Sequence, residues 1–272
     1  AATVVAVSRR GPGQLTDLRA ELESAGTTLV EVAADVADEA AMAALFDRFG
    51  DDLPPLEGVY LAALAGGEAL LTEMTDADVA TMFRPKLDAA VVLHRLTLRH
   101  RVRRFVLFSS ITGLLGSRMV GHYTAANAFA DTLAYARRAL GLSATVVDWG
   151  LWKSWADAQP STKAAGLQPM PNDVAIRMLP LVLSPDAGVQ SVVAGADWQR
   201  LSDAYAMRAP MPILSHLLAG GDTGGVDQLP RPGFGTLLGE PAGTGAAQTW
   251  RAALLPDNKP YPGGHRVRGV EV

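Results

Sequence analysis

The strongest constraint on the fold is a regular alternation of short apolar runs with longer stretches of helical periodicity. Strand-like runs lie near residues 4–7, 28–33, 57–63, 104–109, 144–149 and 189–194. Helical stretches lie near residues 15–24, 37–49, 76–99, 122–140, 172–182 and 197–206. Apolar strands that alternate with amphipathic helices are typical of a parallel sheet covered on both faces. We therefore predict an α/β fold with a doubly wound parallel sheet of the Rossmann-like type.

The start of this pattern lacks a feature that such folds normally carry. A doubly wound nucleotide fold opens with a strand and a glycine-rich turn. Here only Ala1, Ala2 and Thr3 precede Val4, and no G-x-G-x-x-G surrounds that strand. Either the chain begins at the second strand of such a fold, or it does not bind a dinucleotide in the usual way. Because a missing strand leaves its neighbours' backbone groups unpaired, we expect residues 1–272 alone to fold poorly.

Composition removes several classes of function. The chain of 272 residues has no cysteine, which excludes disulfides, thiolate nucleophiles and Cys-ligated metals. Its net charge of −4 gives no reason to expect nucleic acid or an anionic membrane as partner. No apolar run is long enough to span a bilayer, and the N-terminus does not resemble a secretion signal. We expect a cytoplasmic protein without a metal site.

Three residues between the end of the fourth strand-like run and the start of the fifth have side chains suited to proton transfer. Ser110 ends the run Phe105-Val-Leu-Phe-Ser-Ser110, Tyr123 follows 13 residues later, and Asn127 lies one helical turn beyond Tyr123. Lys86, on the helix before that strand, is a candidate cation that lowers the tyrosine pKa. Together these groups can deliver a proton to a carbonyl oxygen. The alternative is a packed tyrosine, a turn serine and a solvated lysine.

Three motifs resemble the ketoreductase domain of type I polyketide synthases, a branch of the short-chain dehydrogenase/reductase superfamily. They are Ser109-Ser-Ile-Thr-Gly113, Gly121-His-Tyr-Thr-Ala-Ala-Asn127 and Val147-Asp-Trp-Gly-Leu-Trp152. The resemblance runs from about residue 4 to 217 and predicts an N-terminally incomplete catalytic domain over 1–217. It implies that the catalytic set comprises Lys86, Ser110, Tyr123 and Asn127, because this family replaces Tyr-x-x-x-Lys by Tyr-x-x-x-Asn and carries its lysine on the preceding helix.

The same resemblance implies a cofactor site for NADPH. Ser8, Arg9 and Arg10 follow the first strand, where arginine accommodates the 2′-phosphate of NADP. Asp35-Val36 resembles the family's contact to adenine, and Trp149-Gly150 resembles the strand end that borders the cofactor and leads into a lid over 153–170. Without the family, the arginines are read as solvated charges and Asp35 as a helix N-cap.

Two departures from the family pattern leave activity open. Leu64 stands where the family has a small residue close to the cofactor, in Leu61-Ala-Ala-Leu64. Gly66-Gly67-Glu68 replaces the Leu-Asp-Asp signature of one stereochemical class, and Leu115 stands where the other class has tryptophan. Product stereochemistry is therefore not assigned. The alternative to an active reductase is a ketoreductase-like scaffold that no longer turns over. A hydrolase is not supported, because the sequence contains no Gly-x-Ser-x-Gly nucleophile elbow.

The C-terminal part has a different character. Residues 218–234 are rich in turn-forming glycine and proline and are predicted to be a linker. Residues 235–272 resemble the opening of a synthase dehydratase domain, in which His265 of Pro260-Tyr-Pro-Gly-Gly-His265 corresponds to the catalytic base. A dehydratase that follows a ketoreductase resembles the iterative enediyne-type synthases.

The resemblance as a whole implies one reaction and one set of partners. The chain is expected to reduce a β-ketoacyl thioester with NADPH to the β-hydroxyacyl thioester. The substrate would be carried on the phosphopantetheine arm of an acyl carrier protein, beside neighbouring synthase domains.

Overall fold

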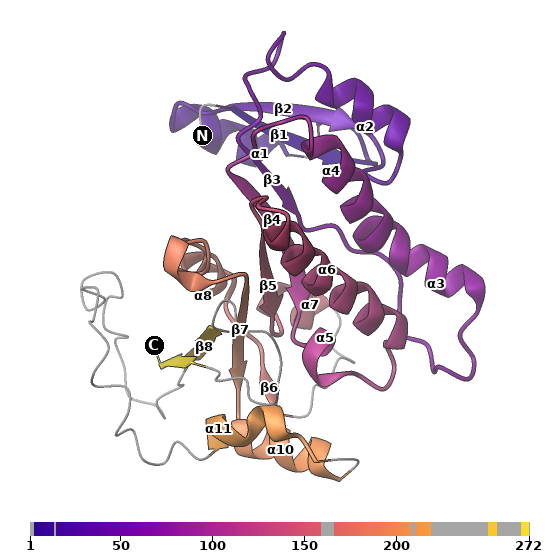
Figure 1. The fold of residues 1–272 in the computed structure, drawn as a ribbon, viewed down its shortest axis with the longest axis vertical. Coiled ribbons are helices and arrows are strands. Elements are labelled where there is room, and N and C mark those ends of the chain that lie inside the picture. The colour runs from indigo at the N-terminus through magenta and orange to yellow at the C-terminus, as the bar shows by residue number, and fades with distance from the viewer. Residues whose placement is uncertain are drawn as a thin grey trace. The chain divides into compact units, whose positions relative to one another are not determined.

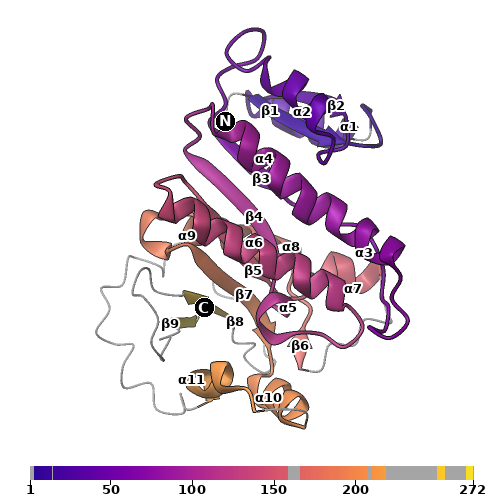
Figure 2. The ribbon, with the colours of Figure 1, turned by 45° about the vertical axis from the view of Figure 1, so that its right-hand side comes forward.

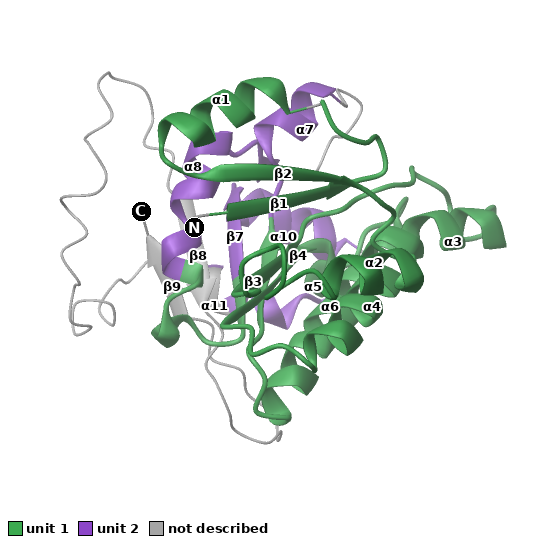
Figure 3. Cartoon of the chain, turned by 90° about the horizontal axis from the view of Figure 1, so that it is seen from above, with its two compact units in different colours: residues 1–149, 182–191 green, residues 150–181, 192–272 purple. Residues whose placement is uncertain are grey.

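The computed structural model describes residues 3–13, 15–158, 166–207, 210–218, 250–254 and 268–271. The chain divides into two compact units (Figure 3). The first unit comprises residues 1–149 and 182–191, and the second comprises 150–181 and 192–272. All four predicted catalytic residues belong to the first unit.

The first unit alternates strands and helices as predicted (Figure 1). Its strands are β1 (Thr3–Ser8), β2 (Thr28–Ala33), β3 (Gly58–Leu61), β4 (Arg104–Ser110) and β5 (Thr145–Trp149). Its helices are α1 (Thr16–Ser24), α2 (Glu39–Phe46), α3 (Asp76–Phe83), η1 (Arg84–Asp88), α4 (Ala89–Thr97), α5 (Thr112–Leu115), α6 (Gly121–Ala139) and the short η2 (Pro185–Ala187).

The strands of the first unit are parallel, which confirms the predicted fold class. β1 pairs with β2 from Thr3 opposite Thr28 to Ser8 opposite Ala33. β3, β4 and β5 pair in that order, and β7 (Gln190–Ala196) follows β5 in the same sheet. The first two residues of β7 lie in this unit. Parallel pairing places the carboxyl ends of the strands at one edge, where α/β proteins bind ligands.

The parallel strands form two sheets instead of one. Among the described residues of the first unit, no strand pairs with both β1 and β3, so the β1–β2 pair is separate from the β3–β4–β5 sheet. The edges of β1 and β3 consequently keep backbone groups that no described strand pairs.

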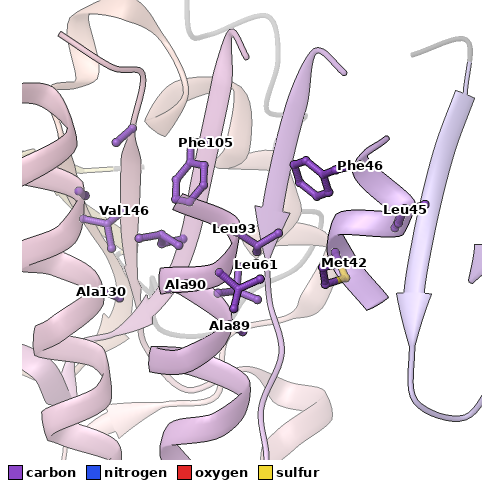
Figure 4. Packing of buried hydrophobic residues seen from close by; sticks show 14 of the residues in the cluster. Met42, Leu45, Phe46, Leu61, Ala89, Ala90, Leu93, Phe105, Ala130 and Val146 are labelled. Atoms are coloured by element: carbon purple, nitrogen blue, oxygen red, sulfur yellow. The ribbon is translucent and has the colours of Figure 1, made fainter. Parts of the chain in front are cut away.

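A hydrophobic core joins β3, β4 and β5 to α2, α4 and α6 (Figure 4). Leu93 and Leu61 lie next to each other, between Val146 and Ala130 on one side and Met42 and Leu45 of α2 on the other. Ala126, Ala130 and Ala134 recur every four residues along α6 and are almost fully buried. Small side chains on one helix face let the helix lie close to the sheet. In two views α4 and α6 lie side by side over β3 and β4 (Figures 1 and 2).

The helical stretch predicted over 76–99 contains an irregularity. The Thr75 side chain and Asp78 form a capping box that begins α3, and α4 ends at Thr97. Between α3 and α4 lies η1, one π-helical turn that carries Pro85. Proline has no N–H and clashes with the preceding turn, so the helix widens locally. Lys86 lies on this widened turn.

The second unit holds β6, most of β7 and the C-terminal elements. Their bounds are α7 (Lys153–Ala158), β6 (Leu167–Gln168), α8 (Asn172–Arg177), α9 (Leu179–Val182, of which Val182 lies in the first unit), α10 (Trp198–Ala206), η3 (Pro212–Leu214), α11 (Ser215–Leu218), β8 (Trp250–Leu254) and β9 (Arg268–Glu271). β6 pairs with β7 and β8 pairs with β9, both antiparallel. The helix predicted over 172–182 is thus divided into α8 and α9.

Several predicted segments lie partly or wholly outside the described residues. The predicted lid over 153–170 contains α7 and β6, but residues 159–165 are not described. The predicted linker over 218–234 is not described beyond Leu218, and His265 lies outside the described residues. Among the described helices, none combines the length and the hydropathy that crossing a membrane requires.

Candidate active site

Ser110 occupies the carboxyl end of β4. It pairs in register with Trp149 of β5 and is 8% exposed. Its hydroxyl oxygen accepts a hydrogen bond from the backbone N–H of Thr112 at 3.3 Å, in the turn that opens α5. The turn fixes the serine at the ligand-binding edge of the sheet.

Tyr123 and Asn127 lie one turn apart on α6 and share a helix face. The Asn127 side-chain amide donates to the backbone oxygen of Tyr123 at 2.9 Å, and Asn127 is fully buried. Burial raises the pKa of Tyr123, and hydrogen bonds with Ser110 and Asn127 partly offset that rise. The prediction that a cation lowers this pKa is therefore wrong for the protein by itself. A raised pKa keeps the phenol protonated, which a proton donor needs.

Lys86 is not the solvated surface charge of the alternative interpretation. It is 7% exposed, and its Nζ donates to the backbone oxygen of Phe108 at 2.9 Å. Its Nζ also lies 5.2 Å from the centroid of the Tyr123 ring. Burial lowers the Lys86 pKa to about 8, against the attraction of Asp131 and Asp148. The lysine thus changes charge close to neutral pH.

The structure brings all four predicted catalytic side chains together. Tyr123 is the common member, because Ser110 and Asn127 lie close enough to influence the pKa of its phenol, and the Lys86 ammonium faces its ring. The four come from three elements that pack on one another, β4, η1 and α6. A hydroxyl, a phenol, an ammonium and a carboxamide at one sheet edge can bind a carbonyl oxygen and supply a proton to it.

Sequence reasoning missed a layer of polar residues under this group. Asp131, Asp148, Ser109 and Gln190 are all buried. The Gln190 side-chain amide donates to Asp148 at 2.6 Å, and the Ser109 hydroxyl donates to the backbone oxygen of Asn127 at 3.4 Å. Two signals were available. Asp131 follows Asn127 by one helical turn, and Asp148 is an acid inside an apolar strand.

The predicted cofactor residues Ser8, Arg9 and Arg10 lie at the carboxyl end of β1 and are exposed. The backbone N–H of Arg10 donates to the Ser8 hydroxyl at 3.2 Å. Gly11 then turns the chain with φ +78°, a conformation that favours glycine. Two exposed arginines on a short turn suit a phosphate.

Asp35 and Val36 follow β2, and each has a structural partner. The Asp35 carboxylate accepts from the Ala37 backbone N–H at 3.0 Å and from the Arg84 guanidinium at 2.8 Å. The Ala37 and Arg84 hydrogen bonds, in that order, lower the Asp35 pKa, so the carboxylate is charged at neutral pH. Val36 packs against the core. Arg84 lies two residues before Lys86, so this ion pair ties the loop after β2 to the turn that carries Lys86, a link that the sequence did not reveal.

Trp149 and Gly150 are separated by the unit boundary. Trp149, in the first unit, is 4% exposed, and its ring lies 5.4 Å from that of Phe108. In the second unit, a Cβ on Gly150 would meet Ala194 Cβ at 2.7 Å, so only glycine fits beside β7. The glycine is therefore explained by packing within the second unit.

The positions that depart from the family pattern differ in exposure. Leu64 is 40% exposed, and Glu68 is exposed as well. Leu115 is buried at the end of α5. Gly66 has φ +91°, and a Cβ there would meet Met82 Cε at 2.8 Å. The loop after β3 is thus shaped by its glycine against α3.

The residues of the first unit fit a nicotinamide dinucleotide better than a metal. Cationic side chains follow β1, and the buried Ser110 ends β4, each at the carboxyl end of its strand, where α/β folds bind ligands. Among the described residues, no group of three or more His, Asp or Glu side chains could hold a metal ion.

Comparison with known proteins identifies the family. A family model described as KR domain matches residues 1–154. The chain therefore belongs to the KR family, the ketoreductase domain of type I polyketide synthases, as its motifs predicted. Its fold is that of the short-chain dehydrogenase/reductases, and the family to which it belongs is one of nicotinamide-dependent oxidoreductases.

Three similar proteins illustrate the relationship. A phenolphthiocerol/phthiocerol polyketide synthase of Mycobacterium tuberculosis is 59% identical over 222 residues, 80% of this chain and 14% of the relative. A type I phenolphthiocerol synthesis polyketide synthase of the same species, whose name includes the word inactive, is 37% identical over 226 residues, 79% of this chain and 14% of the relative. A solved A1-type ketoreductase superposes with a TM-score of 0.74 at 33% identity, covering 80% of this chain and 47% of that one.

The chain spans a small part of these synthases. It covers 14% of the two named relatives and about half of the solved ketoreductase. The enediyne type and the dehydratase-like stretch over 235–272 are not tested by these matches and stay predictions.

Proposed function

We propose that this chain carries out the NADPH-dependent reduction of a β-ketoacyl thioester to the β-hydroxyacyl thioester in polyketide synthesis. The acyl chain would be presented on the phosphopantetheine arm of an acyl carrier protein, beside neighbouring synthase domains. The observation that carries the proposal is the buried convergence of Lys86, Ser110 and Asn127 on Tyr123. The family and the synthase relatives support it.

Each residue has a distinct role in this proposal. Ser110 donates a hydrogen bond to the substrate carbonyl oxygen and orients it. Tyr123 transfers its phenolic proton to the same oxygen as negative charge develops there. Lys86, as an ammonium beside the ring, stabilises the phenolate left behind, and Asn127 holds the helix turn that carries the tyrosine. When bound, NADPH supplies the hydride that reduces the carbonyl carbon.

The cofactor preference follows from the end of β1. Arg9 and Arg10 are exposed cations, and no carboxylate follows β1 directly to bind a ribose 2′-hydroxyl. A guanidinium binds a phosphate with charge-assisted hydrogen bonds, which favours the 2′-phosphate of NADPH. Asp35, held by Arg84, would border the adenine.

The test uses the intact polypeptide that carries this chain. NADPH oxidation is followed by absorbance with a β-ketoacyl thioester on a carrier protein, and the acyl product is identified by mass spectrometry. We expect one β-hydroxyacyl thioester for each NADPH consumed. Oxidation without that product, or with NADH at equal efficiency, contradicts the proposed reaction or the proposed cofactor.

A second candidate function is a structural domain that no longer turns over. Two observations favour it: Leu64 stands at a position that the family keeps small, and one relative has a name that includes the word inactive. This alternative predicts no turnover, together with no NADPH binding. Replacing Leu64 by alanine separates the possibilities, because an increase in NADPH affinity after L64A identifies the leucine as an obstruction.

A further inference from the structure

Two carboxyl groups that the proposed mechanism does not use lie buried beside Lys86. Asp131, on α6, is 8% exposed, and Asp148, on β5, is fully buried. Asp131 follows Asn127 by one turn and so lies on the same helix face. Asp148 pairs in register with Ser109 of β4, whose hydroxyl reaches α6. The two acids therefore meet between the sheet and α6.

Hydrogen-bond donors are too few for two ionised carboxylates. The carboxyl groups contact each other, and Gln190 donates to Oδ2 of Asp148. The Ser109 hydroxyl has one proton to share among Asn127 and both acids. In the described part of the chain, neither Oδ1 of Asp131 nor Oδ1 of Asp148 accepts a hydrogen bond. Two buried anions in contact, with only the shared Ser109 proton between them, are strongly disfavoured.

The charges around Lys86 also indicate that Asp131 and Asp148 are not both ionised. Among the described residues, the titratable groups that interact with it are Tyr123 and Asp131 from α6 and Asp148 from β5, and β4 contributes the uncharged backbone oxygen of Phe108. Burial raises the pKa of both acids, and contact with Asp131 raises that of Asp148 further. One lysine cation balances one negative charge, not two.

We propose that Asp131 and Asp148 share a single proton and together present one negative charge to Lys86. They act through the lysine and are therefore positioning residues: they keep it an ammonium inside the protein and hold it toward Tyr123. This inference deepens the proposed function and rests on it for its catalytic consequence.

The shared proton has an unusual consequence for substitutions. Replacing one acid by asparagine removes the like charge beside the other, which then ionises fully, so one negative charge remains next to Lys86. Replacing both acids removes that charge. We therefore expect each single variant to leave the protonation of Lys86 almost unchanged and the double variant to lower it sharply.

The protonation of Lys86 can be read without activity. The intact polypeptide is labelled briefly with acetic anhydride over a range of pH, and the acetylation of each lysine is measured by mass spectrometry. Lys153 is a reference in the same sample, because its side chain is 56% exposed. We expect half-labelling of Lys86 at the same pH in wild type, Asp131→Asn and Asp148→Asn, and roughly one pH unit or more lower in the double variant.

A second measurement records the pH dependence of kcat. The fall of kcat at high pH should keep its position in both single variants and move to lower pH in the double variant, while KM for NADPH stays within about twofold. If the double asparagine variant does not bind NADPH, Asp131→Asn with Asp148→Ser tests the same loss of charge without added volume.

The outcomes separate this inference from the proposed function. A single variant that shifts Lys86 labelling as far as the double variant overturns the shared proton, and so does a double variant without a shift. Absence of turnover in wild type contradicts the proposed function alone, because the labelling result still decides the charge state of the pair.

Discussion

The proposed catalytic site at the end of β4 and the proposed cofactor site at the end of β1 differ in the exposure of their polar residues. Around β4, Lys86, Asn127, Asp131 and Asp148 are nearly or fully buried. Around β1, Ser8, Arg9 and Arg10 are exposed on a short turn. Both regions lie in the first unit, each at the carboxyl end of a strand in a parallel pair.

The difference reflects what each region has to do. Proton transfer depends on fixed geometry and on pKa values shifted by burial, so its groups are enclosed and hydrogen-bonded. Recognition of a phosphate needs charge and a suitable fork of donors, which exposed arginines provide. Substitutions should therefore change kcat at the first region and cofactor affinity at the second.

The largest effect is expected for Tyr123→Phe. Loss of the phenolic proton should lower kcat roughly 10²–10⁴-fold and leave the NADPH dissociation constant nearly unchanged. Tyr135→Phe is a matched control, because Tyr135 lies farther along α6 and is 41% exposed. Single-turnover kinetics and NADPH fluorescence measure the two quantities. An unchanged kcat in Tyr123→Phe excludes the tyrosine as proton donor.

The next effect concerns the pH dependence set by Lys86. With its pKa lowered to about 8, the lysine is charged below that pH and neutral above it, so kcat should fall as the pH rises through about 8. Lys86→Met keeps the side-chain volume but removes the charge. It should lower kcat roughly 10²-fold and abolish this pH-dependent fall.

Arg99→Met is the control for Lys86→Met, because it removes an exposed cation from the turn after α4. It should leave both kcat and the pH profile as in wild type. A high-pH fall that survives in Lys86→Met assigns the titration to another group and removes the lysine from the relay.

A smaller and different effect is expected for Arg9→Ala. Loss of a charge-assisted hydrogen bond to the 2′-phosphate should weaken NADPH binding on the order of tenfold, with NADH affinity and kcat little changed. Arg101→Ala serves as control, since Arg101 is exposed just before β4, at the opposite end of the strands. Equal weakening of NADPH and NADH contradicts a contact to the 2′-phosphate.

The smallest effect is expected for Arg84→Gln, which removes the ion pair with Asp35. Exposed ion pairs contribute little, so NADPH affinity should change only about twofold and kcat even less. A loss of kcat comparable with that of Lys86→Met indicates instead that this pair orients the π-helical turn. Such a result would join the two regions into one functional unit.

The sequence allowed the class of fold and most of the site to be predicted, for identifiable reasons. The order of strands and helices followed from apolar periodicity. Helices and strands repeat their side-chain directions with different periods, so the spacing of apolar residues indicates which element forms. The pairing of Tyr123 with Asn127 followed from their spacing on one helix. The π-helical turn at Pro85 and the division of the helix over 172–182 were missed, since both depend on local steric detail within helical patterns.

Spacing along the chain brought Tyr123 and Asn127 onto one helix after Ser110, and the family resemblance added Arg9 and Arg10 after the first strand. Only the tertiary structure decided that Lys86 is buried, that Tyr123 keeps a raised pKa, that Arg84 holds Asp35, and that Asp131 meets Asp148. The physical reason is that burial and contact between elements depend on how helices pack on the sheet. A pKa responds to that packing, and no periodicity in the sequence encodes it.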